Sequence, residues 1–242
     1  GIDGGGQSDT PITVTGATEL IGIAPGRAHT CALRAVGTVL CWGWNGHGQL
    51  GDNTFTGRHT PATVNGVSLA KALAAGQHHN CVLLMDGEVR CWGYNDSGQL
   101  GDGTFDTSPV IVIPNINNVT HIALGQEHTC ARVADGTVSC WGLDLSTPEA
   151  RLAASSATSN NTPTVMPGLT NVVQIGVGRF HACVVFANGA ITCWGSNEDG
   201  ELGLGFISNY EEPTQTLFAP ALAPTQLATG SDHVCTLLST GV

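Results

Sequence analysis

The chain has 242 residues, of which 41% are hydrophobic and only 11% are charged, with 33 glycines and 11 prolines. That balance argues against disorder and favours many short strands joined by turns. The formal net charge is −11 with a single lysine, which argues against nucleic acid as a partner. No apolar run approaches the roughly 18 residues of a membrane span, so we expect no membrane insertion.

A repeat begins near the N-terminus and continues along the chain. Residues 3–11 resemble residues 102–109, which lie near the end of a repeat, so the first residues correspond to the last part of a repeat. Five segments then share the pattern Gly-x-x-His-x-Cys, and they start at Gly26, Gly76, Gly125, Gly178 and Gly230. Their spacings of 50, 49, 53 and 52 residues predict a solenoid or a propeller.

Four of these segments lead into a second shared motif, Cys-Trp-Gly, at residues 41–43, 91–93, 140–142 and 193–195. A turn pair lies between the two motifs: Val36-Gly37, Asp86-Gly87, Asp135-Gly136 and Asn188-Gly189. Asp-Gly and Asn-Gly between apolar alternations indicate a β-hairpin, because these residues tolerate the positive φ of such turns. Each unit therefore contains one hairpin.

A looser apolar segment precedes each hairpin and often opens with proline, as at Pro61 and Pro109. Proline suits a first or edge strand, where its missing N–H costs no ladder bond. Each unit then has four short strands in about 50 residues, which is a propeller blade. We expect an all-β chain with a single propeller domain over 1–242, with units at about 10–59, 60–107, 108–161, 162–212 and 213–242.

Residues 76–104, GQHHNCVLLMDGEVRCWGYNDSGQLGDGT, resemble the repeat of the regulator of chromosome condensation family. The resemblance covers essentially the whole chain and is nearest to cysteine-containing bacterial variants thought to be secreted. It implies four complete four-stranded blades and a partial fifth of a seven-bladed ring. The family includes a nucleotide-exchange factor for a small GTPase and an inhibitor of β-lactamases, so the fold alone does not imply one function.

The cysteines form four pairs at a spacing of ten, Cys31/Cys41, Cys81/Cys91, Cys130/Cys140 and Cys183/Cys193, and leave Cys235 unpaired or with its partner missing. The hairpin turn lies at the centre of each pair, so the two cysteines should face each other across the hairpin as a disulfide. Zinc and free buried thiols are the alternatives, but zinc ligands usually lie two to four residues apart. Disulfides imply an oxidising, extracytoplasmic compartment, secreted or at the cell surface.

Histidine and tryptophan also recur once per unit, and we expect both to be structural. Each histidine should make a repeated hydrogen bond within its own blade rather than bind a metal, at His29, His79, His128, His181 and His233. Each tryptophan is next to a cysteine on a strand, so it points away from the disulfide and should pack between blades. These residues are Trp42, Trp92, Trp141 and Trp194.

Candidate binding residues lie where the repeat departs from itself. The third unit replaces Gly-Gln-Leu-Gly with residues 143–162, and the fourth inserts residues 206–212. We expect contacts from the second insert and from the two aromatics that follow Trp-Gly, which gives Phe206, Tyr210, Glu211, Glu212, Trp44 and Tyr94. Three glycosylation sequons begin at Asn95, Asn118 and Asn160.

No nucleophile elbow, zinc-protease motif or calcium-loop pattern is found in the sequence, so we expect no enzyme activity, no metal and no cofactor. The chain stops where the second strand of a fifth hairpin should begin. It is therefore expected to be a fragment of a longer propeller, with an exposed edge that pairs with another chain as the alternative.

Four functions remain open from the sequence. The first is an extracellular or cell-surface binding and adhesion module, whose propeller-face loops contact a protein or a glycan. The second is a structural subunit of a surface layer or filament, in which copies of the chain bind each other. An inhibitor of a secreted enzyme and a nucleotide-exchange factor for a small GTPase are weaker alternatives.

Overall fold

The computed structural model describes residues 9–145, 159–211, 216–218 and 224–239, and these ranges form strands and turns. None of the described segments is a helix long and apolar enough to cross a membrane. Three four-stranded antiparallel sheets follow one another along the chain. They consist of β1 (Leu20–Pro25), β2 (His29–Arg34), β3 (Val39–Gly43) and β4 (Arg58–Thr63); β5 (Ala70–Ala75), β6 (His79–Leu84), β7 (Val89–Gly93) and β8 (Ser108–Val112); and β9 (Val119–Leu124), β10 (His128–Val133), β11 (Val138–Leu143) and β12 (Ser159–Val165).

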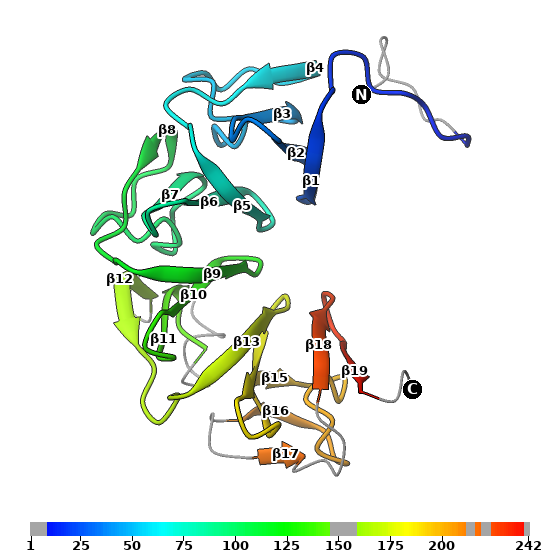
Figure 1. Cartoon of the computed structure of the whole chain (residues 1–242), viewed down its shortest axis with the longest axis vertical. Helices are drawn as coiled ribbons and strands as arrows, with labels where there is room; N and C mark the ends of the chain where they lie inside the picture. Colours follow the sequence, from blue (N-terminus) through cyan, green and yellow to red (C-terminus); the bar gives the residue numbers. More distant parts are fainter. Residues whose placement is uncertain (1–8, 146–158, 212–215, 219–223, 240–242) are drawn as a thin grey trace.

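The fourth sheet has five strands, because two short segments both pair with its third strand. It consists of β13 (Val172–Val177), β14 (His181–Phe186), β15 (Ile191–Asn197), β16 (Ser208–Glu211) and β17 (Thr216–Phe218). The last sheet is the pair β18 (Pro224–Thr229) and β19 (Val234–Leu238). The sheets are propeller blades that form an open arc (Figure 1), and β1, β5, β9, β13 and β18 line its inner side. Four complete blades and a partial fifth are thus confirmed.

The blades begin and end later in the chain than the sequence units. Strand β4 pairs with β3 of the first blade, although the sequence boundary at residue 59 cuts through it. Proline-opened segments are therefore the outermost strand of the preceding blade. The physical reason is that the loop after Trp-Gly returns directly to the edge of its own hairpin, as in the pairing of Gly43 with Arg58.

Each hairpin carries one disulfide at the predicted place. In the first blade Cys31 lies opposite Cys41, and Arg34 N–H donates to Thr38 O near the turn. Counting pairs from that bond puts the cysteines at a non-hydrogen-bonded site, where side chains approach most closely. The disulfides join Cys31–Cys41, Cys81–Cys91, Cys130–Cys140 and Cys183–Cys193. Cys235 is exposed and has no disulfide partner in the described part of the chain.

The core lies between blades rather than inside them. One cluster joins the Cys31–Cys41 disulfide and Leu50 of the first blade to Val82 and Trp92 of the second. The same arrangement recurs between the second and third blades, with Leu100 and Trp141. Trp92 and Trp141 each pack against the preceding blade's disulfide, as predicted. Trp42 instead packs against Ala32 and Leu40 of its own blade, so the prediction is wrong there. A blade cannot bury this surface alone, which is typical of repeat proteins.

Candidate functional site

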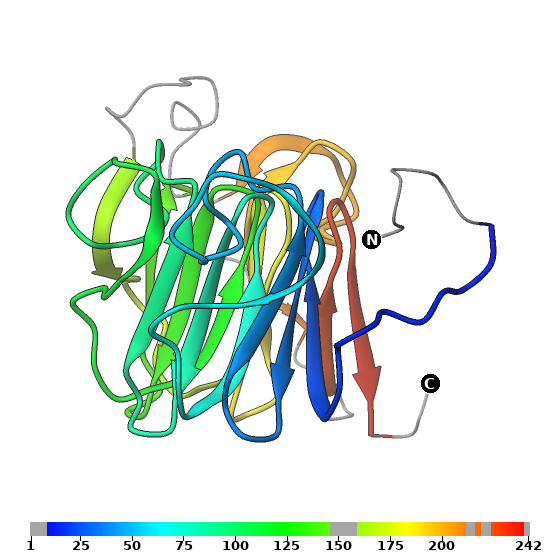
Figure 2. The same ribbon diagram turned by 90° about the horizontal axis from the view of Figure 1, so that it is seen from above.

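The long loops gather at one end of the strands (Figure 2). This end carries the turns 26–28, 76–78, 125–127 and 178–180, and the loops 44–57, 94–107 and 198–207. The pairing of His29 with Gly43 places both kinds of connection at the same end. The tight hairpin turns lie at the other end of the same strands. We call the first end the loop face.

A buried asparagine after Trp-Gly holds each regular loop in shape. Asn45 Oδ1 accepts a hydrogen bond from Leu50 N–H at 2.8 Å, and its Nδ2 donates to Thr54 O at 2.9 Å. The second loop repeats both bonds with Asn95, and the fourth repeats them with Asn197. Because the amide group satisfies buried backbone atoms at both ends of the loop, these loops are rigid supports for neighbouring side chains.

Two of the predicted binding residues, Trp44 and Tyr94, meet in one cluster with two histidines. The ring of His47 lies 4.9 Å from that of Trp44 and 4.5 Å from that of Tyr94, measured between centroids. His78 completes the group at 5.2 Å from Trp44 and 5.3 Å from His47. We call these four residues the aromatic cluster. Trp44 is 43% exposed, and the other three are half-buried.

Local backbone features fix the cluster in place. The Trp44 ring lies over Gly46, where a Cβ would come within 2.3 Å of its Cζ2 atom. Gly43 and Gly93 both have a φ of +111°. This backbone turn lets the next residue's N–H donate to the preceding turn, from Trp44 to Ala28 O and from Tyr94 to His78 O. Glycine is favoured there because other residues rarely adopt this φ.

Burial keeps two members of the cluster, His78 and Tyr94, uncharged near neutral pH. It lowers the pKa of His78 to about 4, and the charges of His47 and Arg27 act in the same direction. It also raises the pKa of Tyr94 to about 12, with help from the carboxylate of Asp96. Half-exposed aromatic rings in contact are typical of energetically dominant residues in protein interfaces.

Charged groups continue the loop face beyond the aromatic cluster. Ser97 Oγ donates to Glu127 at 2.9 Å, and Arg179 Nε donates to Gln126 Oε1 at 2.7 Å. Arg179 also lies over the ring of Phe180, 4.9 Å from its centroid. The turns of all five blades line a polar central hollow of about 870 Å³. The cluster is thus an aromatic patch on a face that also carries polar and charged groups.

The repeated histidines do not bond within their own blades, so that prediction is wrong. His29 Nε2 lies 2.9 Å from Asn80 Oδ1, and His79 Nε2 lies 2.9 Å from Thr129 Oγ1, each in the next blade. Asn80 and Thr129 in turn donate to the main-chain oxygens of Gln49 and Gln99. The ring covers the Gly-x-x-His glycine, where a Cβ would clash, and so points across the blade boundary.

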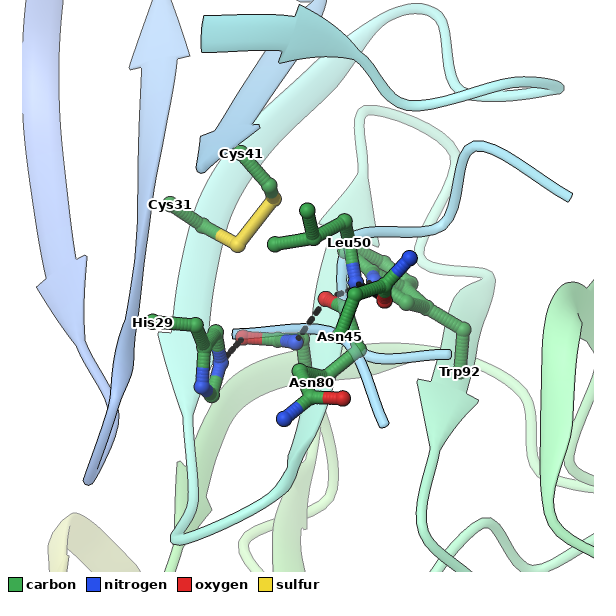
Figure 3. The surroundings of a disulfide bond; sticks show 8 residues. His29, Cys31, Cys41, Asn45, Leu50, Asn80 and Trp92 are labelled. Atoms are coloured by element: carbon green, nitrogen blue, oxygen red, sulfur yellow. Dashed lines mark hydrogen bonds between the residues drawn. A yellow bond between two sulfur atoms is a disulfide. The ribbon is translucent and has the colours of Figure 1, made fainter. Parts of the chain in front are cut away.

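The same glutamine oxygens accept the indole N–H of the next blade's tryptophan. Trp92 Nε1 donates to Gln49 O, and Trp141 Nε1 donates to Gln99 O, both at 2.9 Å. Figure 3 shows this inter-blade relay of His29, Asn80 and Trp92 beside the Cys31–Cys41 disulfide and Leu50. His29 and His79 therefore connect blades. The described residues include no group of three His, Cys, Asp or Glu side chains that could hold a metal ion.

The other predicted binding residues lie apart from the cluster. Phe206 is 50% exposed on the fourth blade's loop, and Glu211 is half-buried on β16. Glu212 and the side chain of Tyr210 lie outside the described residues. The structure does not bring Phe206 or Glu211 into contact with Trp44 and Tyr94, so their binding role stays a prediction.

The three sequons differ in accessibility. Asn95 is fully buried, and its Nδ2 is used in the loop hydrogen bonds, so it cannot carry a glycan in the folded protein. The sequon prediction is therefore wrong at Asn95, because this asparagine is the counterpart of Asn45 and its side chain is used in the hydrogen bonds of the loop. Asn118 and Asn160 are exposed.

Sequence reasoning missed His47 and His78 in the cluster. Both stand outside the five repeated histidine positions, at sites where neighbouring repeats have other residue types. The comparison of repeats was therefore the signal, since His47 matches Ser97 and His78 matches Ala28 and Glu127. The sequence alone does not show that the turn with His78 and the loop with His47 lie at the same end of the blades, so the two histidines could not be grouped.

Comparison with known proteins agrees with this architecture. The family model of the regulator of chromosome condensation (RCC1) repeat matches residues 36–83, 86–132 and 188–237, and a second model of that repeat matches 21–49, 70–99 and 172–201. Protein pim1 of Schizosaccharomyces pombe is 47% identical over 45 residues, which is 19% of this chain and 8% of pim1.

Two solved structures show the same fold. Human WBSCR16 has a TM-score of 0.79 at 23% identity, over 91% of this chain and 58% of that one. Yeast RCC1 (Prp20), in its crystal structure with Kap60, has a TM-score of 0.77 at 23% identity, over 90% and 53%. The chain thus spans little more than half of these structures. With more than half of its residues matched by the first repeat model, the chain belongs to the RCC1 repeat family.

Proposed function

We propose that this protein is a non-catalytic binding module that acts outside the cytoplasm and holds a protein partner on its loop face. The observation that carries the proposal is the aromatic cluster of Trp44, His47, His78 and Tyr94, which is held by rigid loops and is half-exposed. Rigid aromatic side chains lose little conformational entropy on binding, so they contribute strongly to affinity.

The relatives and the charge of the chain support a protein as the partner. Yeast RCC1 (Prp20), which shares the fold, has been crystallised bound to another protein, Kap60. The net charge of −11 argues against nucleic acid. The face also offers the charged side chains of Glu127 and Arg179, which suits the polar rim of a protein interface.

The disulfides support a place outside the cytoplasm. All four hairpins carry a buried disulfide, and cytosolic reductants normally keep such thiols reduced. Each crosslink also stiffens the hairpin whose strands end at the loop face. A secreted or surface location is therefore part of the proposal.

The test compares two double variants in binding of the labelled protein to intact cells and secreted proteins of its source. Trp44→Ala/Tyr94→Ala should weaken saturable binding by at least about tenfold, because each substitution removes a central contact. The matched control, Val36→Ala/Met85→Ala, removes two exposed apolar side chains from the hairpin turns at the other end and should bind like wild type. Equal binding by both variants would contradict the proposed site.

A further inference from the structure

The boundary between the third and fourth blades lacks the inter-blade relay. At the two earlier boundaries a Gln-Leu segment fills the space beside the disulfide, with Leu50 and Leu100 fully buried. The third blade has no Gly-Gln-Leu-Gly after Trp141-Gly142. Among the described residues, nothing therefore supplies the main-chain oxygen that accepts the tryptophan indole at the earlier boundaries.

The next blade has also lost the polar side chain of the relay. Where Asn80 and Thr129 stand at the earlier boundaries, the fourth blade has Ala182. His128 is 1% exposed, and neither of its ring nitrogens has a hydrogen-bond partner. A buried imidazole without a partner costs free energy, which a bound hydrogen-bonding group would recover.

A cavity of about 460 Å³ occupies this boundary. Its lining includes His128, Trp194 and the Cys130–Cys140 disulfide, which are the counterparts of His29, Trp92 and Cys31–Cys41 in Figure 3. Met166 also lines the cavity and is the counterpart of Val64 in the first blade. Both residues donate their N–H to the equivalent strand carbonyl, Met166 to Val138 O and Val64 to Val39 O. Leu50 contacts the equivalent surface in the first blade. The cavity is thus the place that a Gln-Leu segment fills elsewhere.

We propose that this cavity is a binding site for a short extended peptide segment with a leucine-type side chain. The leucine side chain would lie against the Cys130–Cys140 disulfide and Met166. The carbonyl before it would accept the Trp194 indole N–H, as Gln49 O accepts that of Trp92. His128 would donate to a second acceptor of the segment through the nitrogen that faces Asn80 or Thr129 in its counterparts.

The chain itself supplies the pattern for the ligand. Asp144 takes the place of Asn45 after Trp-Gly and lines the cavity. Folded copies of this chain cannot supply the segment, because Leu50 and Leu100 are buried in their own cores. We therefore assign the segment to a partner protein. This site is independent of the aromatic cluster.

The test uses the folded, disulfide-bonded chain and the peptide N-acetyl-Gly-Gln-Leu-Gly-amide in calorimetric and ¹H–¹⁵N NMR titrations. We expect saturable binding that moves the Trp194 indole signal. Replacing the peptide's leucine by alanine should weaken binding about 30-fold, from the loss of roughly 2 kcal/mol of buried apolar surface. Absence of binding, an unmoved Trp194 signal, or equal affinity for the alanine peptide would each overturn the proposal.

Two tryptophan variants separate the indole contact from general packing. Trp194→Phe removes the N–H that faces the peptide and should weaken binding about fivefold. Trp92→Phe makes the same change at a boundary already filled by Gln49, so it should leave peptide affinity unchanged. Trp44→Ala/Tyr94→Ala should also leave it unchanged, which distinguishes failure of this site from failure of the loop-face proposal. Equal affinities of Trp194→Phe and wild type would contradict the assigned indole contact.

Discussion

Single residues connect the blades through hydrogen bonds that the sequence could not assign. The repeated Gly-x-x-His-x-Cys pattern indicates that the histidine is structural, but not which blade its ring faces. The ring lies over the glycine three residues earlier, as His79 lies over Gly76, and points across the boundary to the next blade. Its partner, Thr129 for His79, lies 50 residues away, and the repeats differ at that position. Variation between repeats hides such a pair from a search for shared motifs.

Buried histidines make stability depend on pH. Burial lowers the pKa of both His79 and His128 to about 3, whereas an unfolded histidine has a pKa of about 6.5. Below pH 6.5 the unfolded chain therefore binds protons that the folded chain does not, so the free energy of unfolding falls as pH falls. Each of the two should contribute about 1 kcal/mol per pH unit between pH 6 and 5.

Urea unfolding with intact disulfides, at pH 8, 7, 6 and 5, measures this effect. The free energy of unfolding should be nearly equal at pH 8 and 7, where these histidines are neutral in both states, and should fall steadily below pH 6. This window lies above the ordinary pKa of carboxylates, so histidines dominate it. The same unfolding free energy at pH 7 and 5 would show that the histidines are not buried as neutral groups.

At the scale of elements, the hairpins could be predicted closely and the outer strands could not. Asp86-Gly87 fixes the turn, and the cysteine spacing then fixes the register of Cys81 with Cys91. The outer strand β8 pairs with β7 through only Val112 and Ser108, across a register shift. Its sequence carries no turn signal that ties it to β7, so its membership of the preceding blade depends on contacts between distant residues.

Each disulfide should stabilise its own hairpin. Closing a loop of about ten residues removes unfolded-state entropy worth about 3 kcal/mol. We therefore expect Cys81→Ala/Cys91→Ala to lower the free energy of unfolding by about that amount, measured in urea at pH 7. The single variant Cys81→Ala already opens the loop, so adding Cys91→Ala should cost less than about 1 kcal/mol more. A double variant as stable as wild type would contradict the role of the crosslink.

At the scale of the whole molecule, the period of about 50 residues predicts the propeller, whereas both candidate sites depend on departures from it. Trp44 and Tyr94 could be named from the sequence because they follow the repeated Trp-Gly. Their contact through His47 and His78 could not, since it joins a loop of one blade to a turn of the next. The cavity at Trp194 arises from what the third blade lacks, and a missing motif has no residue to mark it.

The central claim is that this is a disulfide-stabilised propeller acting outside the cytoplasm. It is tested most directly by alkylating the protein as isolated from its native source, without reductant, and mapping the cysteines by mass spectrometry. We expect the eight hairpin cysteines to stay unlabelled and to be recovered as linked peptides, 31 with 41, 81 with 91, 130 with 140 and 183 with 193. Labelling of these cysteines in unfolded but unreduced protein would contradict it, because it would show free thiols and a reducing compartment.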